Sequence, residues 1–221
     1  MTPNWPSAAS KPDPSFTALA CAWMSDPANN LLGFVWAAYD NMKASPPVVD
    51  TADLERSITQ LLQPRIERAM SGDEPFYIQH ESYEHETKAP PPAQPPAYDL
   101  AFVSWVDERV KWPLEAKVLA TPKRLSDYEK DIRNEFLTCR YAPFSSSGAM
   151  LGYLLTGSAL DVLSGISERL KCDLDEVDGF SSRPHRSSTH KRTVPSGKNY
   201  PQNFQCHHLI LDYSGLARHK T

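Results

Sequence analysis

The chain has 221 residues, of which 40% are hydrophobic and 23% are charged. These values are near those of globular proteins, so the composition excludes a wholly disordered chain, a coiled coil and a collagen-like fibre. The length suits a single domain. Twenty prolines against nine glycines indicate stiff extended connections more than flexible linkers.

The cysteines lie far apart, at positions 21, 139, 172 and 206. A chain of this length can fold without disulfides, so we expect free thiols and a cytoplasmic location. The sequence does not begin with a basic stretch followed by an apolar run. We therefore expect neither a signal peptide nor a membrane span.

The net charge of -4 is distributed unevenly. Residues 180–221 contain seven Lys or Arg and one Asp, a net charge of +6, which leaves -10 for residues 1–179. A basic end on an acidic body is compatible with a polyanion-binding face on this domain.

The order of the predicted elements indicates an α/β fold, in which a central mixed β-sheet is flanked by helices. Residues 1–15 contain four prolines and predict a disordered tail. A single domain is expected over residues 16–221.

Four helices are predicted from apolar residues at helical spacing and from capping residues. Their expected ranges or starting residues are 30–43, 51–70, Ser126 and Ser158. Asp50 or Thr51 is expected to cap the second helix, and Ser126 and Ser158 each have an acidic residue three positions later. The last helix is predicted to bury an apolar stripe of Leu160, Leu163, Ile166 and Leu170.

Four strands are predicted from apolar, aromatic and β-branched runs, at 98–106, 112–120, 150–155 and 204–213. The polar residues 107–110 join the first two runs, which predicts a hairpin. Trp105 and Trp112, on either side of the turn, are predicted to be packing residues. Residues 89–97 hold five prolines and predict an extended, polyproline-like lead-in to the hairpin.

The candidate catalytic residues lie on this hairpin. Glu115 and Lys117 are two apart in a strand and therefore point to the same face, and a turn centred on Glu108 places Asp99 opposite Lys117. Two carboxylates and an amine inside an apolar sequence are costly to bury unless a divalent cation joins them, and oxygen ligands suit Mg²⁺. An exposed strand with an ordinary Glu–Lys pair is the plain alternative.

The pattern resembles the PD-(D/E)xK nuclease superfamily, which has the restriction-endonuclease-like fold. It is carried by Tyr98-Asp99, a gap of fifteen residues and then Glu115-Ala116-Lys117 between apolar flanks. A helix precedes and a helix follows, so the resemblance covers roughly residues 50–170. Tyr98 stands in place of the proline that gives the motif its first letter.

The resemblance implies that Asp99 and Glu115 are metal ligands and that Lys117 is the catalytic lysine. Members of the family often add a glutamate from the first core helix. Glu55 is the first choice here, with Glu67 and Glu81 as the other candidates. The plain alternative is that Glu55 is a surface acid at a helix N-terminus, where the helix dipole favours negative charge.

The implied activity is that of a metal-dependent endodeoxyribonuclease, which hydrolyses phosphodiester bonds in DNA with Mg²⁺, or with Mn²⁺ in its place. A small nuclease without a recognition domain suggests a protein partner, as in bacterial antiphage defence or restriction systems. A homodimer is expected because cutting two strands takes two sites.

Residues 181–192 are expected to form a basic loop in which hydroxyls alternate with cations. Such side chains bind phosphate oxygens. The predicted nucleic-acid-binding residues are Arg183, Arg186, Ser187, His190, Lys191 and Arg192. A solvated loop without a specific role is the alternative.

Three other interpretations stay open. A zinc site could draw on Cys172, His185, His190, Cys206, His207 and His208, although their spacing resembles no zinc finger or knuckle. The chain could instead be a non-catalytic nucleic-acid-binding subunit that retains a nuclease-like fold. It could also be an interaction subunit whose proline segment docks in an aromatic groove of a partner.

Overall fold

The computed structural model describes residues 15, 28–87, 94–105, 107–216 and 218–219. Its helices are α2 (Ala28–Ala44), α3 (Leu54–Ala69), α4 (Ser126–Asp131) and α5 (Ala159–Leu170), and α4 continues into a π-helical segment, η1 (Ile132–Phe136). Its strands are β1 (Val49–Asp50), β2 (Phe76–Tyr83), β3 (Ala97–Ser104), β4 (Lys111–Leu119), β5 (Ser147–Leu154), β6 (Asp175–Glu176), β7 (His185–Lys191), β8 (Asn203–Asp212) and β9 (Arg218–His219).

The fold is α/β, with a mixed seven-stranded sheet in the order β2-β3-β4-β5-β8-β7-β6. The central pairs β4–β5 and β5–β8 are parallel, and the remaining pairs are antiparallel. A separate two-stranded sheet joins β1 to β9 in parallel. The expectation of a mixed sheet flanked by helices is confirmed, and the strands predicted at 98–106, 112–120, 150–155 and 204–213 all form, within a few residues of their expected ends.

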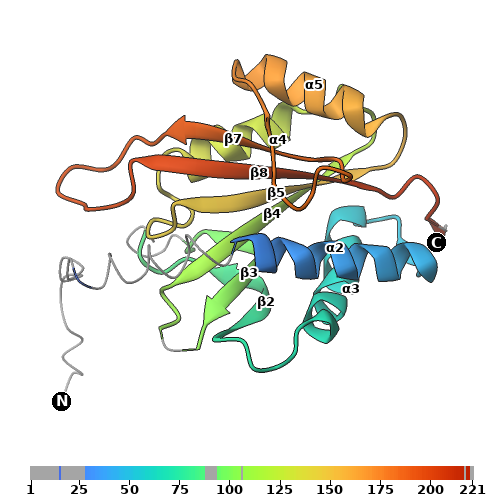
Figure 1. Cartoon of the computed structure of the whole chain (residues 1–221), viewed down its shortest axis with the longest axis horizontal. Coiled ribbons are helices and arrows are strands. Elements are labelled where there is room, and N and C mark those ends of the chain that lie inside the picture. The colour runs from blue at the N-terminus through green and yellow to red at the C-terminus, as the bar shows by residue number, and fades with distance from the viewer. Residues whose placement is uncertain (1–14, 16–27, 88–93, 106, 217, 220–221) are drawn as a thin grey trace.

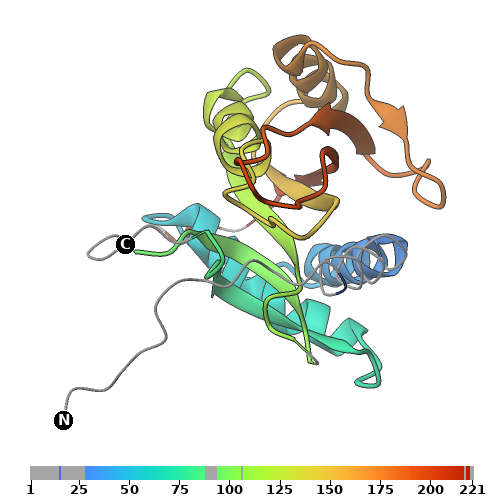
Figure 2. The same cartoon turned by 90° about the vertical axis from the view of Figure 1, so that its left-hand side faces the viewer.

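Helices cover both faces of the sheet (Figures 1 and 2). One hydrophobic cluster joins the sheet to α2 and α3 through buried Val35, Ile58 and Leu62. The other joins it to α4, η1 and α5, through Tyr128 and Ile166 among others. Because the two clusters lie on opposite faces of the same strands, the alternation of side chains along β3 and β4 decides which layer each residue meets.

The helix caps differ from their prediction. The side chain of Asp53, not of Asp50 or Thr51, caps α3 by accepting a hydrogen bond from Arg56 N at 3.3 Å. Ser126 is the first residue of α4 and makes no side-chain cap. Ser158 caps α5 as predicted, with its hydroxyl accepting from Leu160 N.

Two apolar residues predicted to pack are exposed. Leu160 lies in the first turn of α5 and is 70% exposed, because the face of this helix that meets the sheet is centred on Val162 and Ile166 instead. Trp112 is fully buried as predicted, but Trp105 is 65% exposed and lies against the ring of Tyr77 at 4.3 Å between centroids.

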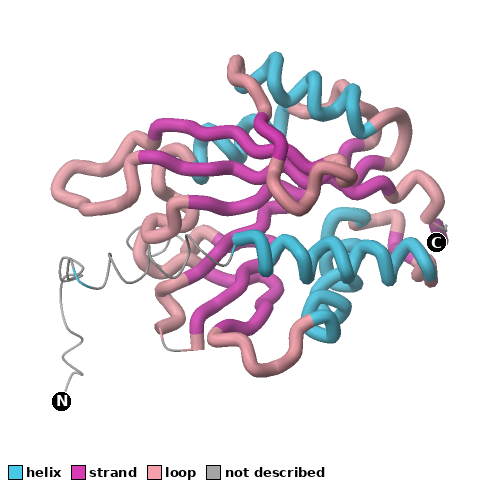
Figure 3. The backbone as a smooth tube through the Cα atoms, in the orientation of Figure 1, coloured by secondary structure: helices cyan, strands magenta, loops and turns pink. Residues whose placement is uncertain are grey.

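Residues 181–192 do not form a loop. Residues 185–191 are strand β7, which pairs antiparallel with β8 along its whole length (Figure 3). The loop prediction was wrong because the hydroxyl and imidazole groups of this segment resemble those of solvent-exposed residues. In the sheet, cross-strand partners form hydrogen bonds with several of them. Residues 1–14 of the predicted tail and residues 89–93 of the proline segment lie outside the described residues.

The cysteines at 139, 172 and 206 are free thiols, as expected. No helix among the described residues is both long and apolar enough to cross a membrane.

Candidate metal and catalytic site

Asp99 and Glu115 lie opposite each other on neighbouring strands. The β3–β4 register pairs Leu100 with Leu114, and its continuation by one step sets Asp99 against Glu115. Lys117 was expected at that position, so the predicted register was wrong by two residues. The reason is the turn, which is centred on Asp107 and not on Glu108, since a shift of one in the turn centre moves the register by two.

A backbone hydrogen bond holds the Asp99 carboxylate against β4. Its Oδ2 accepts from Ala116 N at 2.7 Å, at the level where the two strands part. The hairpin therefore brings together both predicted metal ligands, as the sequence implied.

The ammonium of Lys117 contacts three carboxylates from three separate elements. Its Nζ lies 3.0 Å from Glu115 Oε1, 3.2 Å from Glu55 Oε1 and 3.1 Å from Asp131 Oδ2. It also donates to the carbonyl of Ala116 at 2.7 Å, and its side chain is only 18% exposed. Burial by itself lowers the pKa of Lys117, but the surrounding carboxylates, Glu115 first, raise it above its ordinary value. Lys117 is therefore held as a cation.

Glu55 is the glutamate of the first core helix that reaches this cluster. It lies in the first turn of α3, and its second oxygen, Oε2, accepts from Val118 N at 3.0 Å. Of the other two candidates, Glu67 is exposed further along α3, and Glu81 forms an ion pair with Arg56 at 3.1 Å.

Asp131 is the member of the cluster that the sequence interpretation missed. It is the last residue of α4, directly before the π-helical segment. A signal was present, because Asp131 follows the buried Tyr128 by three positions and precedes the buried Ile132 by one, which places it at the edge of the core-facing stripe. Nothing in the sequence tells which part of the sheet that stripe covers.

Burial raises the pKa values of the two facing carboxyls. Burial raises the pKa of Asp99 from 3.8 to about 6, while Lys117 and the N–H of Ala116 lower it in part. Burial and then the charge of Asp99 raise the pKa of Glu115 well above its ordinary value, with Lys117 acting in the opposite direction. Four carboxylates around one ammonium carry a formal charge of -3 if all ionise, so the cluster favours added positive charge.

Glu115 Oε2 is buried and has no hydrogen-bond partner among the described residues. Asp131 Oδ2 is also buried and has only its ion pair with Lys117, without hydrogen-bond geometry. A buried carboxylate oxygen without a partner is costly, and hard oxygen ligands of this kind suit Mg²⁺. Asp99 and Glu115 thus fit a divalent cation by donor type, with water completing the coordination. No group of three or more His, Cys, Asp or Glu in the described ranges has the arrangement of a ready metal site.

The cations predicted to bind nucleic acid are largely engaged within the fold. Arg183 forms a bidentate pair with Asp40 at 2.7 and 2.6 Å, and Arg186 contacts Glu176 at 3.4 Å. Arg192 is buried, and its guanidinium donates to three backbone carbonyls, those of Phe136, Ser145 and Tyr141. Arg192 therefore acts as a packing residue and not as a solvent-facing phosphate ligand.

The other members of that predicted set divide in the same way. Ser187 is buried and accepts from Gln205 Nε2, His190 lies 2.7 Å from Ser188 Oγ, and Lys191 is exposed. Strand β7 is three positions from β4 in the sheet, or about 14 Å at the usual strand spacing. The basic strand thus lies to one side of the carboxylate cluster.

The histidines considered for zinc pair with protein groups on the two faces of the sheet. His185 Nε2 lies 3.2 Å from His207 Nδ1 on the α2 face, while His208 contacts Tyr128 OH at 3.0 Å and Ser188 Oγ at 2.8 Å on the other face. Burial lowers the pKa of His185 and His208 to about 3, so these rings are neutral. Their division between two faces does not bring the six candidates together.

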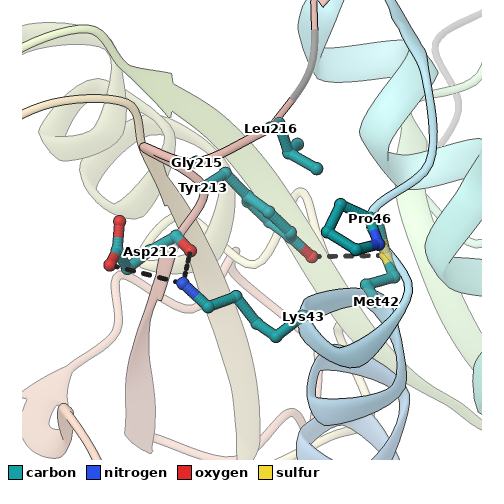
Figure 4. A pocket seen from close by; sticks show the side chains of 7 residues that line it. All are labelled: Met42, Lys43, Pro46, Asp212, Tyr213, Gly215 and Leu216. Atoms are coloured by element: carbon teal, nitrogen blue, oxygen red, sulfur yellow. Dashed lines mark hydrogen bonds and ion pairs between the residues drawn. The ribbon is translucent and has the colours of Figure 1, made fainter.

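A small pocket of about 150 Å³ lies apart from the carboxylates, between the end of α2 and the end of β8 (Figure 4). Within it Lys43 contacts the carboxylate and the carbonyl of Asp212, and Tyr213 OH donates to Met42 Sδ. Its polar groups are paired with one another, and it shares no lining residue with the cluster around Lys117.

Comparison of the chain with protein-family models, with curated proteins and with solved structures found no match in any of the three.

Proposed function

We propose that the protein is a metal-dependent nuclease that hydrolyses phosphodiester bonds in DNA, with Asp99 and Glu115 as ligands of Mg²⁺ and Lys117 as the catalytic lysine. The observation that carries this proposal is the pair of facing carboxylates on the β3–β4 hairpin, in which Glu115 Oε2 is buried without a partner beside the ammonium of Lys117. The resemblance to the PD-(D/E)xK nucleases in the sequence supports the same assignment.

The charge of the cluster explains why such a chemistry needs an added cation. A phosphodiester is an anion, and four carboxylates around one ammonium repel it. Bound Mg²⁺ would supply positive charge to the phosphoryl oxygens and lower the pKa of the attacking water. Asp99 and Glu115 would hold this cation, and Oε2 of Glu115 is an oxygen that lies buried without a hydrogen bond among the described residues.

Lys117 has the properties of a charge-stabilising group. Because its carboxylate neighbours raise its pKa, it remains an ammonium at neutral pH and is not suited to accept a proton from water. As a donor it would orient the water that attacks phosphorus, or neutralise the charge that develops on the phosphoryl oxygens as the bond to the leaving oxygen breaks. Glu55 and Asp131 fix the position from which it does so.

One observation favours a second candidate. The three carboxylates around Lys117 already use an oxygen each on the ammonium, and no ready three-ligand metal group occurs among the described residues. An ion-paired cluster of this kind also fits a subunit that retains a nuclease-like fold but binds nucleic acid without cleaving it. Calorimetric titration with Mg²⁺ separates the two, since only the nuclease requires binding heat that disappears in Asp99→Asn.

The test of the nuclease is incubation of the purified protein with plasmid DNA and Mg²⁺ or Mn²⁺. Cleavage is expected from the wild-type protein and from Glu67→Gln, which changes an exposed acid on the same helix as Glu55. Cleavage is expected to be lost in Asp99→Ala and in Lys117→Ala. Equal cleavage by the wild type and both site variants would refute the assignment, because it would trace the activity to a contaminant or to another site.

A partner that delivers DNA remains part of the proposal, in the manner of an antiphage or restriction system. A pulldown from cells of the native host, compared with one that uses a surface variant such as Trp105→Ser, would test whether the exposed hairpin tip takes part.

A further inference from the structure

Glu81 has a left-handed backbone conformation within strand β2, with a φ of 51°. The residues on either side of it pair regularly with β3, which places Glu81 level with Asp99. A non-glycine residue with positive φ is uncommon inside a strand, and residues of this kind concentrate at functional sites.

The side chain of Glu81 contacts an arginine of α3. In a regular antiparallel pair, residues that lie opposite each other project from the same face of the sheet, so Glu81 would add a further carboxylate beside Asp99. Instead, its Oε1 lies 3.1 Å from Nη2 of Arg56 on α3. The residue with the strained backbone thus forms an ion pair with Arg56, so that this position carries a cation beside its carboxylate.

Arg56 follows Glu55 on α3, and its ion-pair partner on β2, Glu81, is level with Asp99. Glu55 directly precedes it in the first turn of α3 and reaches both Lys117 and the N–H of Val118. The side chain of Arg56 is 55% exposed, whereas that of Lys117 is 18% exposed and enclosed by carboxylates. Arg56 is therefore the exposed cation that the helix carries next to the candidate catalytic residues.

A guanidinium can serve Glu81 and a phosphate at once. It presents five N–H donors in a planar fork, of which the contact with Glu81 Oε1 engages one nitrogen. Phosphate oxygens accept such donors in short charge-assisted hydrogen bonds. The carboxylate of Glu81 fixes the orientation of the fork.

We propose that Arg56 binds a backbone phosphate of the nucleic-acid substrate at the rim of the carboxylate cluster and that Glu81 positions it. The proposal rests on the proposed nuclease function and assigns to it a contact for substrate binding. Arg56 holds the strand, and Asp99, Glu115 and Lys117 act on the phosphodiester bond.

The experiment is steady-state cleavage of a short fluorescent DNA duplex at several salt concentrations. Arg56→Gln is expected to raise KM about tenfold, the loss of one charge-assisted hydrogen bond, while kcat changes little. In Arg56→Gln the slope of log(kcat/KM) against log[salt] is expected to become shallower by the amount that about one phosphate contact contributes. Arg56→Lys should restore part of that slope.

Two controls separate this contact from other causes. Arg68→Gln removes an exposed arginine three turns further along α3 and should leave KM and the salt dependence unchanged. The double variant Arg56→Gln with Glu81→Gln keeps the local charge balanced, and its KM should remain raised. A wild-type KM in the double variant would overturn the proposal, because the effect of Arg56→Gln would then arise from an unpaired Glu81 that repels DNA.

The remaining outcomes distinguish this proposal from the function on which it rests. Cleavage that requires Asp99 but is unchanged in Arg56→Gln would overturn the role of Arg56 alone. Absence of any cleavage that depends on Asp99 would overturn both.

Discussion

Asp99 faces Glu115 across the β3–β4 hairpin, and the N–H of Ala116 binds the Asp99 carboxylate at 2.7 Å. This pairing places two acids where the side chains of adjacent strands are closest, and burial keeps water from screening them. Burial is the main cause of the raised pKa values of both carboxyls, and the charge of Asp99 raises the pKa of Glu115 further.

Replacement of Asp99 by asparagine is expected to stabilise the protein at neutral pH. The pKa of Asp99 is about 6 in the folded chain and ordinarily 3.8, so the folded state binds more protons between these values. The stabilisation that comes from protonated Asp99 in the folded state is fully present below about pH 4 and is lost as the pH rises through about 6. Asp99→Asn cannot ionise and should gain about 2–3 kcal/mol over the wild type at about pH 8, but little at about pH 4. Urea unfolding at the two pH values measures the difference.

The control for this prediction is Asp107→Asn, where the sign is reversed. The hydrogen bond from the Arg109 side chain lowers the pKa of Asp107, so its contribution is present at neutral pH and lost in acid. Asp107→Asn should therefore be less stable than the wild type at about pH 8. A loss of stability at that pH in Asp99→Asn as well would contradict the penalty that burial places on the ionised carboxylate of Asp99.

Replacement of Lys117 by methionine should be strongly destabilising. It leaves Glu115, Glu55 and Asp131 without the cation that neutralises them, and removal of one partner of a buried ion pair costs about 3–5 kcal/mol. Thermal or urea unfolding measures this loss. Lys130→Met, on the exposed side of α4, should change stability by less than about 0.5 kcal/mol. Similar values for the two variants would show that the cluster is solvated.

Asp131→Asn is expected to affect catalysis through Lys117. In the cleavage assay kcat should fall about 10-fold to 100-fold, the usual effect of losing a group that orients a catalytic residue, while Mg²⁺ affinity stays near the wild-type value. Asp127→Asn, exposed on the same helix, should behave as wild type. If Asp131→Asn weakens Mg²⁺ binding as much as Asp99→Asn does, Asp131 is a metal ligand and not a positioning residue.

Arg192→Met is expected to act on stability and not directly on DNA binding. The buried guanidinium donates hydrogen bonds to three backbone carbonyls. Loss of this donor should lower the free energy of unfolding by about 3 kcal/mol. Lys191→Met, its exposed neighbour, should be nearly neutral in urea unfolding. A stable Arg192→Met protein that has lost DNA affinity would restore the phosphate-contact role first predicted for this residue.

The sequence predicted the sheet better than it predicted the details of the site. The strands around Asp99 and Glu115 were identifiable because apolar, aromatic and β-branched residues form short runs there, and the two strands are buried along most of their length. The alternation of side chains along a strand then placed Glu115 and Lys117 on one face. The register was not identifiable, because it depends on a turn whose centre at Asp107 is one of several possible in a polar run. Contacts between distant segments, such as that of Asp131 with Lys117, depend on which helix packs over which strand.

Tyr98 and strand β7 show a second limit. Tyr98, in the place of a motif proline, donates its hydroxyl proton to buried Glu84 and accepts from Ala142 N at 2.9 Å. In β7, Ser188 and His185 are buried beside polar partners on β8 and α2. From the sequence alone, polar residues of this kind resemble surface residues. Their burial is possible only because residues distant in the sequence supply hydrogen-bond partners.

The ammonium of Lys117 joins two helical layers that pack on opposite faces of the sheet. Glu55 comes from α3 on one face and Asp131 from α4 on the other, and both contact the same nitrogen at the end of β4. The lysine therefore works as a reversible cross-link between the helical layers. A ligand that draws these carboxylates away would loosen that link, and the amide protons at the start of α3 and the end of α4 should then exchange with solvent together.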